Sequence, residues 1–357
     1  MLIVDVHDRV DDRAWDARVV ASGDGTIFQT SSWGTYSAAY LGDTCHYLVV
    51  RDGDRVVGQL LVLETLRGQE SALSGRRRPL RRLITPLLKT MQWRQGPVVV
   101  RPDDRADVLG ACLEAIDALA GEQGVTGMEE VSAPAGYEPP LLSSFAEHGY
   151  RCEARATIVV DVSRSIEQLW DGIKSEARTR VRKGQKGGVT VRQLRRSELP
   201  LFHKLVSDWR HSAGFPQYTA ARYDEMMRHL GPQCAVFLAE HGGVAAAGAG
   251  IWHVGGWGHV FTPVHSPAAR DTGAGDVMQW EMLRWSHEHG LRTLDLAGVA
   301  PEPRSDKERG IRRFKEKWGG IVAEYPVFTR VLKPGRWRLA DSMRKARRAL
   351  RSVRHGQ

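Results

Sequence analysis

The stretch SDKERGIRRFKEKWGG, residues 305–320, predicts one short helix near the end of the chain. Ser305 followed by Glu308 is a capping-box pattern that starts a helix, and Gly319 with Gly320 stops it. We therefore expect a helix over residues 305–318. Its buried stripe, at spacings of three and four residues, consists of Ile311, Phe314, Lys315 and Trp318.

Lys315 is the unusual member of that stripe, because it shares a face with three large apolar side chains. Burying an ammonium group without a partner is costly. The side chain therefore either covers apolar surface with its stem while its head reaches water, or points into a polar pocket that uses its charge. Both readings stay open from the spacing alone.

Two segments around this lysine resemble a known family. GIRRFKEKWGG (310–320), preceded by LDLAG (294–298), resembles the ending of the Fem family. Fem proteins consist of two fused acetyltransferase-like domains, and they move an aminoacyl group from a charged tRNA to an amine, typically on a peptidoglycan precursor peptide. The resemblance implies that Lys315 binds the aminoacyl end or stabilises developing negative charge. It also implies that Phe314 shapes the pocket or stacks on the terminal adenosine, and that Asp295 orients Lys315 or accepts a proton. The alternative for Asp295, at the end of an apolar strand, is that it caps the following loop.

Length and composition set the frame for this resemblance. The chain has 357 residues, of which 42% are hydrophobic and 26% charged, so two globular domains are expected. No apolar run reaches the roughly 18 residues that span a bilayer, and the acidic N-terminus does not read as a signal peptide, so we expect a cytoplasmic protein. Four well-separated cysteines indicate neither a disulfide framework nor a zinc site, and we expect no metal and no bound cofactor.

The positive charge is concentrated at the C-terminus. Of the net charge of +9, residues 333–357 carry +8, with nine basic residues and one acid. We expect residues 334–357 to form a basic tail, helical in part, that suits RNA phosphates or peripheral contact with the inner membrane leaflet. A solvated basic end is the alternative.

The first domain is placed at residues 1–156. The segment FQTSSW (28–33) resembles the entrance of Fem N-terminal domains, which marks Gln29 and Trp33 as substrate-binding candidates, with core packing as the alternative for Trp33. Where some family members carry a lysine that binds a nucleotide-linked precursor, this chain has Ser37 and Tyr40. Residues 80–91 keep helical spacing in a basic apolar stretch, which we expect to be an interfacial or packed helix.

The second domain is placed at residues 157–333. A single helix over 166–186 is expected, and its basic end resembles a Fem element. Cations at a helix C-terminus are favourable in themselves, but five within nine residues favour a tRNA or substrate phosphate site. The cations assigned to that site are Arg178, Arg180, Arg182 and Lys183. Tyr223 is a substrate-binding candidate, and it joins His253, His259 and His265 as a possible proton carrier.

A second phosphate motif competes with the Fem reading. Arg270, Gly273 and Gly275 match the RxxGxG loop with which coenzyme A acyltransferases bind pyrophosphate, and the loop lies between a strand and a helix N-terminus. It favours an acyl-CoA-dependent N-acyltransferase as the alternative function.

The sequence thus predicts an α/β protein of two tandem acetyltransferase-like (GNAT-like) domains. The predicted activity is an aminoacyltransferase with aminoacyl-tRNA as co-substrate and a peptide or small-molecule amine as acceptor. A non-catalytic GNAT-like binding module is the third reading. The signatures of proteases, esterases and nucleotide triphosphatases are missing from the sequence.

Overall fold

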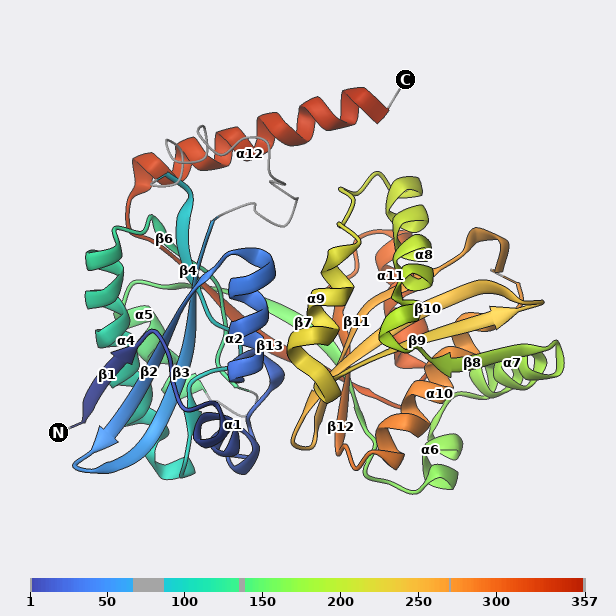
Figure 1. Cartoon of the computed structure of the whole chain (residues 1–357), viewed down its shortest axis with the longest axis horizontal. Helices are drawn as coiled ribbons and strands as arrows, with labels where there is room; N and C mark the ends of the chain where they lie inside the picture. Colours follow the sequence, from blue (N-terminus) through green and yellow to red (C-terminus); the bar gives the residue numbers. More distant parts are fainter. Residues whose placement is uncertain (1, 67–86, 135–138, 270, 356–357) are drawn as a thin grey trace. The chain divides into compact units, whose positions relative to one another are not determined.

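The computed structural model describes residues 2–66, 87–134, 139–269 and 271–355 (Figure 1). The chain divides into two compact units: Met1–Glu153 with Pro326–Gln357, and Ala154–Tyr325. The sequence placed the boundary after residue 156 and extended the second domain to 333. In the structure the last strand returns to the first unit from Pro326, so the basic tail belongs to unit 1. No helix in the described ranges is both long and apolar enough to cross a membrane.

Unit 1 is a sheet with helices packed on it. Its elements are β1 (Ile3–His7), α1 (Asp12–Ala21), α2 (Ser31–Tyr36), β2 (Thr44–Asp52), β3 (Arg55–Leu66), β4 (Lys89–Gln92), β5 (Val98–Val99), α4 (Arg105–Gln123), β6 (Gly127–Val131), α5 (Pro139–Glu147) and α12 (Pro334–His355). The strand order is β1-β2-β3-β4-β6, followed by the end of β13 (Ile321–Val331), while β5 pairs with β3.

One predicted helix of unit 1 is wrong in its described part. Residues 80–86 lie outside the described residues, but Lys89–Gln92 is strand β4, not helix. It pairs antiparallel with the end of β3, and Thr90 and Met91 are both fully buried. Sheet pairing on a central strand therefore overrides the helical spacing of its apolar residues.

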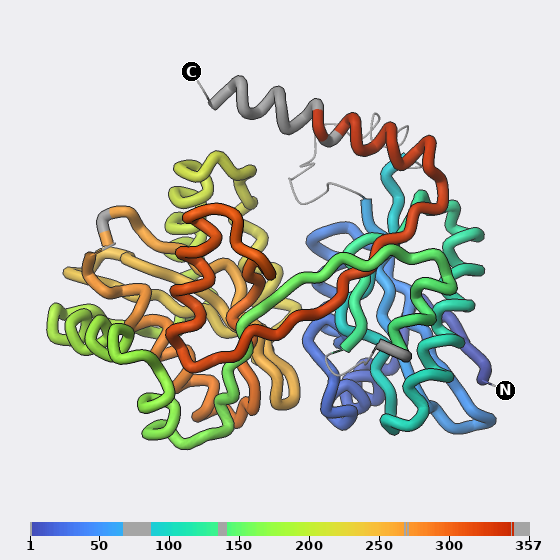
Figure 2. Tube along the Cα trace, turned by 180° about the vertical axis from the view of Figure 1, so that it is seen from behind, coloured from blue at the N-terminus to red at the C-terminus, as the bar shows by residue number. Residues whose placement is uncertain are grey.

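Unit 2 has helices on both faces of a second sheet. Its elements are β7 (Arg151–Asp161), α6 (Ile166–Gly172), α7 (Ser175–Lys186), β8 (Val189–Gln193), α8 (Leu199–Ser212), α9 (Ala221–Leu230), β9 (Cys234–His241), β10 (Val244–Val254), β11 (Trp257–His265), α10 (Ala274–Glu288), β12 (Thr293–Val299), α11 (Asp306–Glu316) and the start of β13. The strand order is β7-β12-β11-β10-β9-β8. Strands β7 and β13 run side by side (Figure 2).

The predicted helix over 166–186 is two helices. α6 ends at Gly172, and Ile173 and Lys174 are extended, with ψ angles of 149° and 146°. The break inserts Ile173, which is 2% exposed, into the core. The Lys174 N–H donates to the Lys317 carbonyl (2.9 Å), so the break also receives the end of α11.

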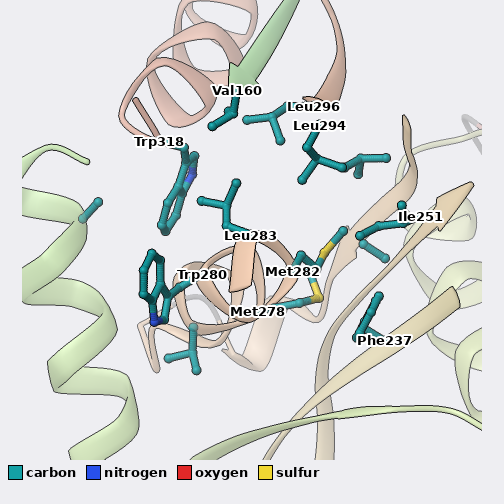
Figure 3. Close-up of a cluster of buried hydrophobic side chains, with 14 of the residues drawn as sticks. Val160, Phe237, Ile251, Met278, Trp280, Met282, Leu283, Leu294, Leu296 and Trp318 are labelled. Atoms are coloured by element: carbon teal, nitrogen blue, oxygen red, sulfur yellow. The ribbon is translucent and has the colours of Figure 1, made fainter. Parts of the chain in front are cut away.

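The core of unit 2 surrounds α10 (Figure 3). Trp280 and Leu283 of that helix pack with Leu294 and Leu296 of β12 and with Trp318, which follows α11. Trp318 is fully buried and fixes the end of α11 to the sheet. Because a buried tryptophan contributes several kcal/mol, roughly 3–5 on truncation, α11 is held firmly at the end that carries Lys315.

Candidate functional site

Helix α11 begins as the sequence predicts. The Ser305 hydroxyl accepts from the Glu308 N–H (3.2 Å), and the Glu308 carboxylate accepts from the Ser305 N–H (3.1 Å), which closes the capping box. The helix ends at Glu316, two residues earlier than predicted, and Lys317 is its C-cap. Of the predicted stripe, Trp318 is fully buried while Ile311 is 42% exposed, so the buried face is narrower than its spacing indicates.

Lys315 points at backbone, not at a carboxylate. Its Nζ donates to the carbonyl oxygens of Ala297 (2.8 Å) and Gly298 (2.9 Å). Burial lowers the pKa of Lys315 to about 8, while the nearby Asp295 carboxylate acts in the opposite direction. Neutral carbonyls satisfy the donors of the ammonium group without cancelling its charge, so Lys315 keeps a positive field to offer a ligand.

A bulge in β12 presents these carbonyls. The register between β12 and β7 shifts between Asp295 and Gly298, and Ala297 takes the left-handed conformation with φ of 66°. Left-handed backbone is strained for an alanine. The distortion turns two consecutive carbonyls toward α11, where Lys315 binds both.

Asp295 holds the bulge in place. Its Oδ1 accepts from the Ala297 N–H (2.7 Å) and from the Thr157 hydroxyl, and the carboxylate is 4% exposed. Burial raises the pKa of Asp295, but the charge of His259 and the hydrogen bonds outweigh it and leave this pKa below its ordinary value. Asp295 therefore caps the loop after its strand, which is the structural alternative that the sequence offered for it, and it positions the carbonyls that hold Lys315.

His259 is the partner of Asp295, and among the four possible proton carriers the sequence did not distinguish it from the others. Its Nδ1 lies 3.2 Å from Asp295 Oδ2, and its ring stacks on Trp252 at 5.9 Å between ring centroids. His259 on β11 is directly opposite Asp295 on β12, at the last of the three positions over which these parallel strands pair. A carboxylate on Nδ1 leaves Nε2 as the nitrogen that can take up a proton, which is the arrangement of an oriented general base.

Lys317 lies near this cluster in sequence but has a different role. It is 6% exposed and forms an ion pair with Asp276, in the first turn of α10, which also accepts from Arg180 Nε (2.8 Å). The Lys317 ammonium also lies 4.4 Å from the ring centre of Phe314. Phe314 is half-buried against the core, and its ring makes a cation–π contact with Lys317.

The predicted phosphate cations on α7 differ in their contacts within the protein. Arg178 donates to the carbonyls of Trp170 (3.3 Å) and Asp171 (3.0 Å) at the end of α6, Arg180 pairs with Asp276, and Arg182 lies over the Trp170 ring (5.2 Å). Lys183 is exposed. Three of the four side chains therefore have contacts within the protein, and their grouping as one phosphate site stays a prediction.

The glycines of the RxxGxG loop have packing partners inside the protein. Arg270 lies outside the described residues. A side chain at Gly273 would meet the Arg180 carbonyl at 3.0 Å, and one at Gly275 would meet the His265 ring at 2.5 Å. Helix α7 approaches the loop through Gly184, and the Ala274 N–H at the start of α10 donates to the Thr272 hydroxyl oxygen (3.2 Å). Close packing against α7 accounts for Gly273, and close packing against His265 of β11 accounts for Gly275.

The other predicted substrate residues are structural in their contacts. Gln29 is fully buried, with its amide donating to the Arg94 carbonyl (2.9 Å) and accepting from the Leu61 N–H (2.9 Å). Trp33 packs against Phe28 in the same unit. Tyr223 is 1% exposed beneath α8, and burial raises its pKa to about 12. All three side chains are buried, and their part in substrate binding stays a prediction.

A basic cleft of about 440 Å³ runs beside α11. Its lining residues are Lys174, Glu176, Pro303, Arg309, Arg312, Arg313 and Glu316. Arg312 is engaged by Glu316 (2.8 Å) and by the Pro301 carbonyl (2.7 Å), which fixes one cation of the cleft in place. The excess of positive charge suits an anionic ligand next to the helix that carries Lys315.

Comparison with known proteins supports the resemblance found in the sequence. A family model described as an acetyltransferase (GNAT) domain matches residues 173–316. The lipid II:glycine glycyltransferase of Staphylococcus haemolyticus is 33% identical over 89 residues, which cover 24% of this chain and 21% of that protein. The chain thus matches about a fifth of the length of this curated relative.

Solved structures extend the similarity to the fold of nearly the whole chain. The crystal structure of FemX superposes with a TM-score of 0.74 at 15% identity, covering 94% of this chain and 99% of FemX. A tandem GNAT protein from the clavulanic acid biosynthesis pathway superposes with a TM-score of 0.55 at 16% identity, covering 92% and 98%. The chain is therefore similar to lipid II:glycine glycyltransferases in part of its sequence, and its fold is similar to those of FemX and of a tandem GNAT protein.

Proposed function

We propose that this protein is an acyltransferase that moves an aminoacyl group from aminoacyl-tRNA to an amine, with a peptidoglycan precursor peptide as the acceptor. The observation that carries the proposal is Lys315, a largely buried cation bound to two bulge carbonyls beside the Asp295 and His259 pair. The similarity to lipid II:glycine glycyltransferases and to the FemX fold supports the acceptor class.

The cluster offers each group that aminolysis of an ester needs. The acceptor amine attacks the ester carbonyl carbon, which forms the C–N bond and puts negative charge on the carbonyl oxygen. A fixed cation at Lys315 stabilises that charge. Collapse then breaks the C–O bond to the ribose, and the proton lost by the amine passes to the departing ribose oxygen. His259, oriented by Asp295, is the group that we assign to carry this proton.

The packing of the RxxGxG loop supports an RNA donor over coenzyme A. An anion at the start of α10 would have to displace helix α7 and the buried Asp276 carboxylate already there. Lys317 and Arg180 already form ion pairs with the Asp276 carboxylate at that helix end, so both cations are engaged within the protein.

A donor competition assay tests the proposal. Purified protein is incubated with bulk tRNA charged with labelled amino acids, or with labelled acetyl-CoA, together with lipid-linked and nucleotide-linked precursor peptides. We expect label to pass from tRNA to a precursor peptide in an amide bond, with acetyl-CoA unused. Transfer from acetyl-CoA with none from tRNA would overturn the proposal.

A further inference from the structure

A surface loop of unit 2 gathers aromatic rings and cations outside the hydrophobic core. Trp209, in the last turn of α8, and Phe215, in the α8–α9 loop, stack with ring centroids 5.5 Å apart, and Phe215 is 42% exposed. Tyr218 follows in the same loop. Trp209 and Tyr218 are half-buried, and Phe215 is the exposed ring of the group. Exposing a large aromatic ring costs solvation free energy, so an exposed ring within a group of aromatic side chains indicates a contact surface.

Three cations lie on the faces of these rings. The Arg210 guanidinium lies over the rings of Tyr218 and Phe215, at 3.8 and 5.6 Å from their centroids. The Arg222 guanidinium also lies over the Tyr218 ring (4.0 Å), and the ammonium of Lys307, from α11, lies 6.0 Å from the Phe215 centroid. The segment 209–222 contains no acidic residue. We name the set Trp209, Arg210, Phe215, Tyr218, Arg222 and Lys307 the aromatic loop.

The aromatic loop is held in a defined shape. The Phe215 N–H donates to the Arg210 carbonyl (2.8 Å), Arg210 Nε donates to the Pro216 carbonyl, and His203 Nε2 lies 3.1 Å from the Tyr218 carbonyl. A preformed loop loses little conformational entropy on binding, so its rings can serve as a platform.

The chemistry of the aromatic loop fits unpaired nucleotides. Bases stack on aromatic side chains irrespective of sequence, while cations between the rings contact the phosphates. A purely apolar partner would meet three cations on the rings, and an acidic peptide would pair with the cations without stacking on the exposed Phe215 ring. A single nucleic acid strand uses both features.

Helix α11 connects this surface to the candidate site. Lys307 lies in its first turn, and Lys315 follows eight residues later. At about 1.5 Å per residue the two positions are about 12 Å apart along the helix. Stacked nucleotides rise about 3.4 Å each along a strand, so that span fits about three to four of them.

We propose that the aromatic loop stacks unpaired nucleotides next to the 3′ end of the RNA donor, so that the esterified terminus reaches Lys315. This inference rests on the proposed function and assigns it a surface. It predicts that the protein distinguishes an RNA hairpin with a single-stranded 3′ overhang of four nucleotides from a blunt hairpin of the same stem.

The test is a binding titration of the full chain with these two uncharged hairpins, with 2-aminopurine at one overhang position. We expect the overhang hairpin to bind about tenfold more tightly than the blunt one, as one base stack would give, and 2-aminopurine fluorescence to be quenched. Phe215→Ala should remove that preference and the quenching. Leu201→Ala is the matched control, because it truncates an apolar side chain of α8 that is similarly exposed (45%) and lies outside the aromatic loop.

A charge variant separates stacking from electrostatics. Lys307→Gln should lower the dependence of binding on salt by about one phosphate contact while leaving the quenching in place. Equal binding of both hairpins, or full quenching with folded Phe215→Ala, would overturn this inference. In either case transfer from intact aminoacyl-tRNA would still stand as the test of the proposed function.

Discussion

Lys315 and Lys317 lie two residues apart at the end of α11, yet the protein gives them different surroundings. Lys317 is buried against the carboxylate of Asp276, which also pairs with Arg180. Lys315 donates to two backbone carbonyls, and burial lowers its pKa to about 8 against the opposing effect of the Asp295 charge. A neutralised buried cation holds structure together, whereas a cation on neutral dipoles remains able to act on a ligand.

The position of each residue on the helix explains the difference. Lys315 is still helical and lies over the β12 bulge, while Lys317 is the C-cap and turns toward the start of α10. A comparison of variants at the two positions therefore separates chemistry from stability, and the predictions below begin with the largest expected effect.

Lys315→Met should reduce aminoacyl transfer by about 10³-fold, because removing a group that stabilises an oxyanion costs about 10²–10³ in rate. The variant should remain folded, since its partners are backbone carbonyls that bulk water can reach in part. Single-turnover transfer is the measurement, and Lys204→Met, a lysine whose side chain is 77% exposed, is the control. Transfer within threefold of wild type would remove Lys315 from the mechanism.

Lys317→Met should instead destabilise the fold, by about 3 kcal/mol, because breaking a buried ion pair leaves an uncompensated carboxylate. The remaining Arg180 contact keeps the loss at the lower end of that range. Urea unfolding measures it, with Lys315→Met as the paired variant that should lose less than about 1 kcal/mol. Equal destabilisation by both variants would contradict the contrast between the lysines.

His259→Asn should slow transfer by about 10²-fold, the lower end for loss of a general base. Thr157→Val is the comparison, since it removes a hydrogen bond to Asp295 without removing a proton carrier. An unchanged rate in His259→Asn would assign proton transfer to another group.

The smallest effect concerns pH. If the ammonium form of Lys315 is the active one, transfer is supported below its pKa of about 8 and is lost as the pH rises above it. At pH 9 wild type should therefore transfer about tenfold more slowly than at its plateau, whereas Lys315→Arg, which keeps its charge, should show no such decline. A parallel decline in both proteins would place the titration elsewhere.

Local patterns of the sequence suffice to predict several elements of the fold. The hairpin of β2 and β3, helix α4 and the capping box at Ser305 each follow from alternation, length or cap chemistry confined to a few neighbouring residues. Errors arose where tertiary packing decided the outcome. One example is the break between α6 and α7, where Ile173 enters the core and Lys174 bonds to Lys317. The other is β4, which was predicted as helix but pairs with β3.

The candidate site was predictable only in part. Lys315 stood out because its position on an apolar stripe is local information. The bulge at Ala297, the pairing of His259 with Asp295 and the ion pair of Lys317 with Asp276 depend on strand register and on contacts between residues far apart in sequence. No spacing rule over neighbouring residues can report them.

The most direct test of the contrast is an NMR titration of the lysine side chains, with 13C-labelled lysine in the full chain, between about pH 6 and 11. The account predicts one lysine resonance with a midpoint near 8, which is absent in the Lys315→Arg variant. If that variant removes only a resonance that titrates near the ordinary lysine value, Lys315 is a conventional surface cation and the proposed mechanism loses its basis.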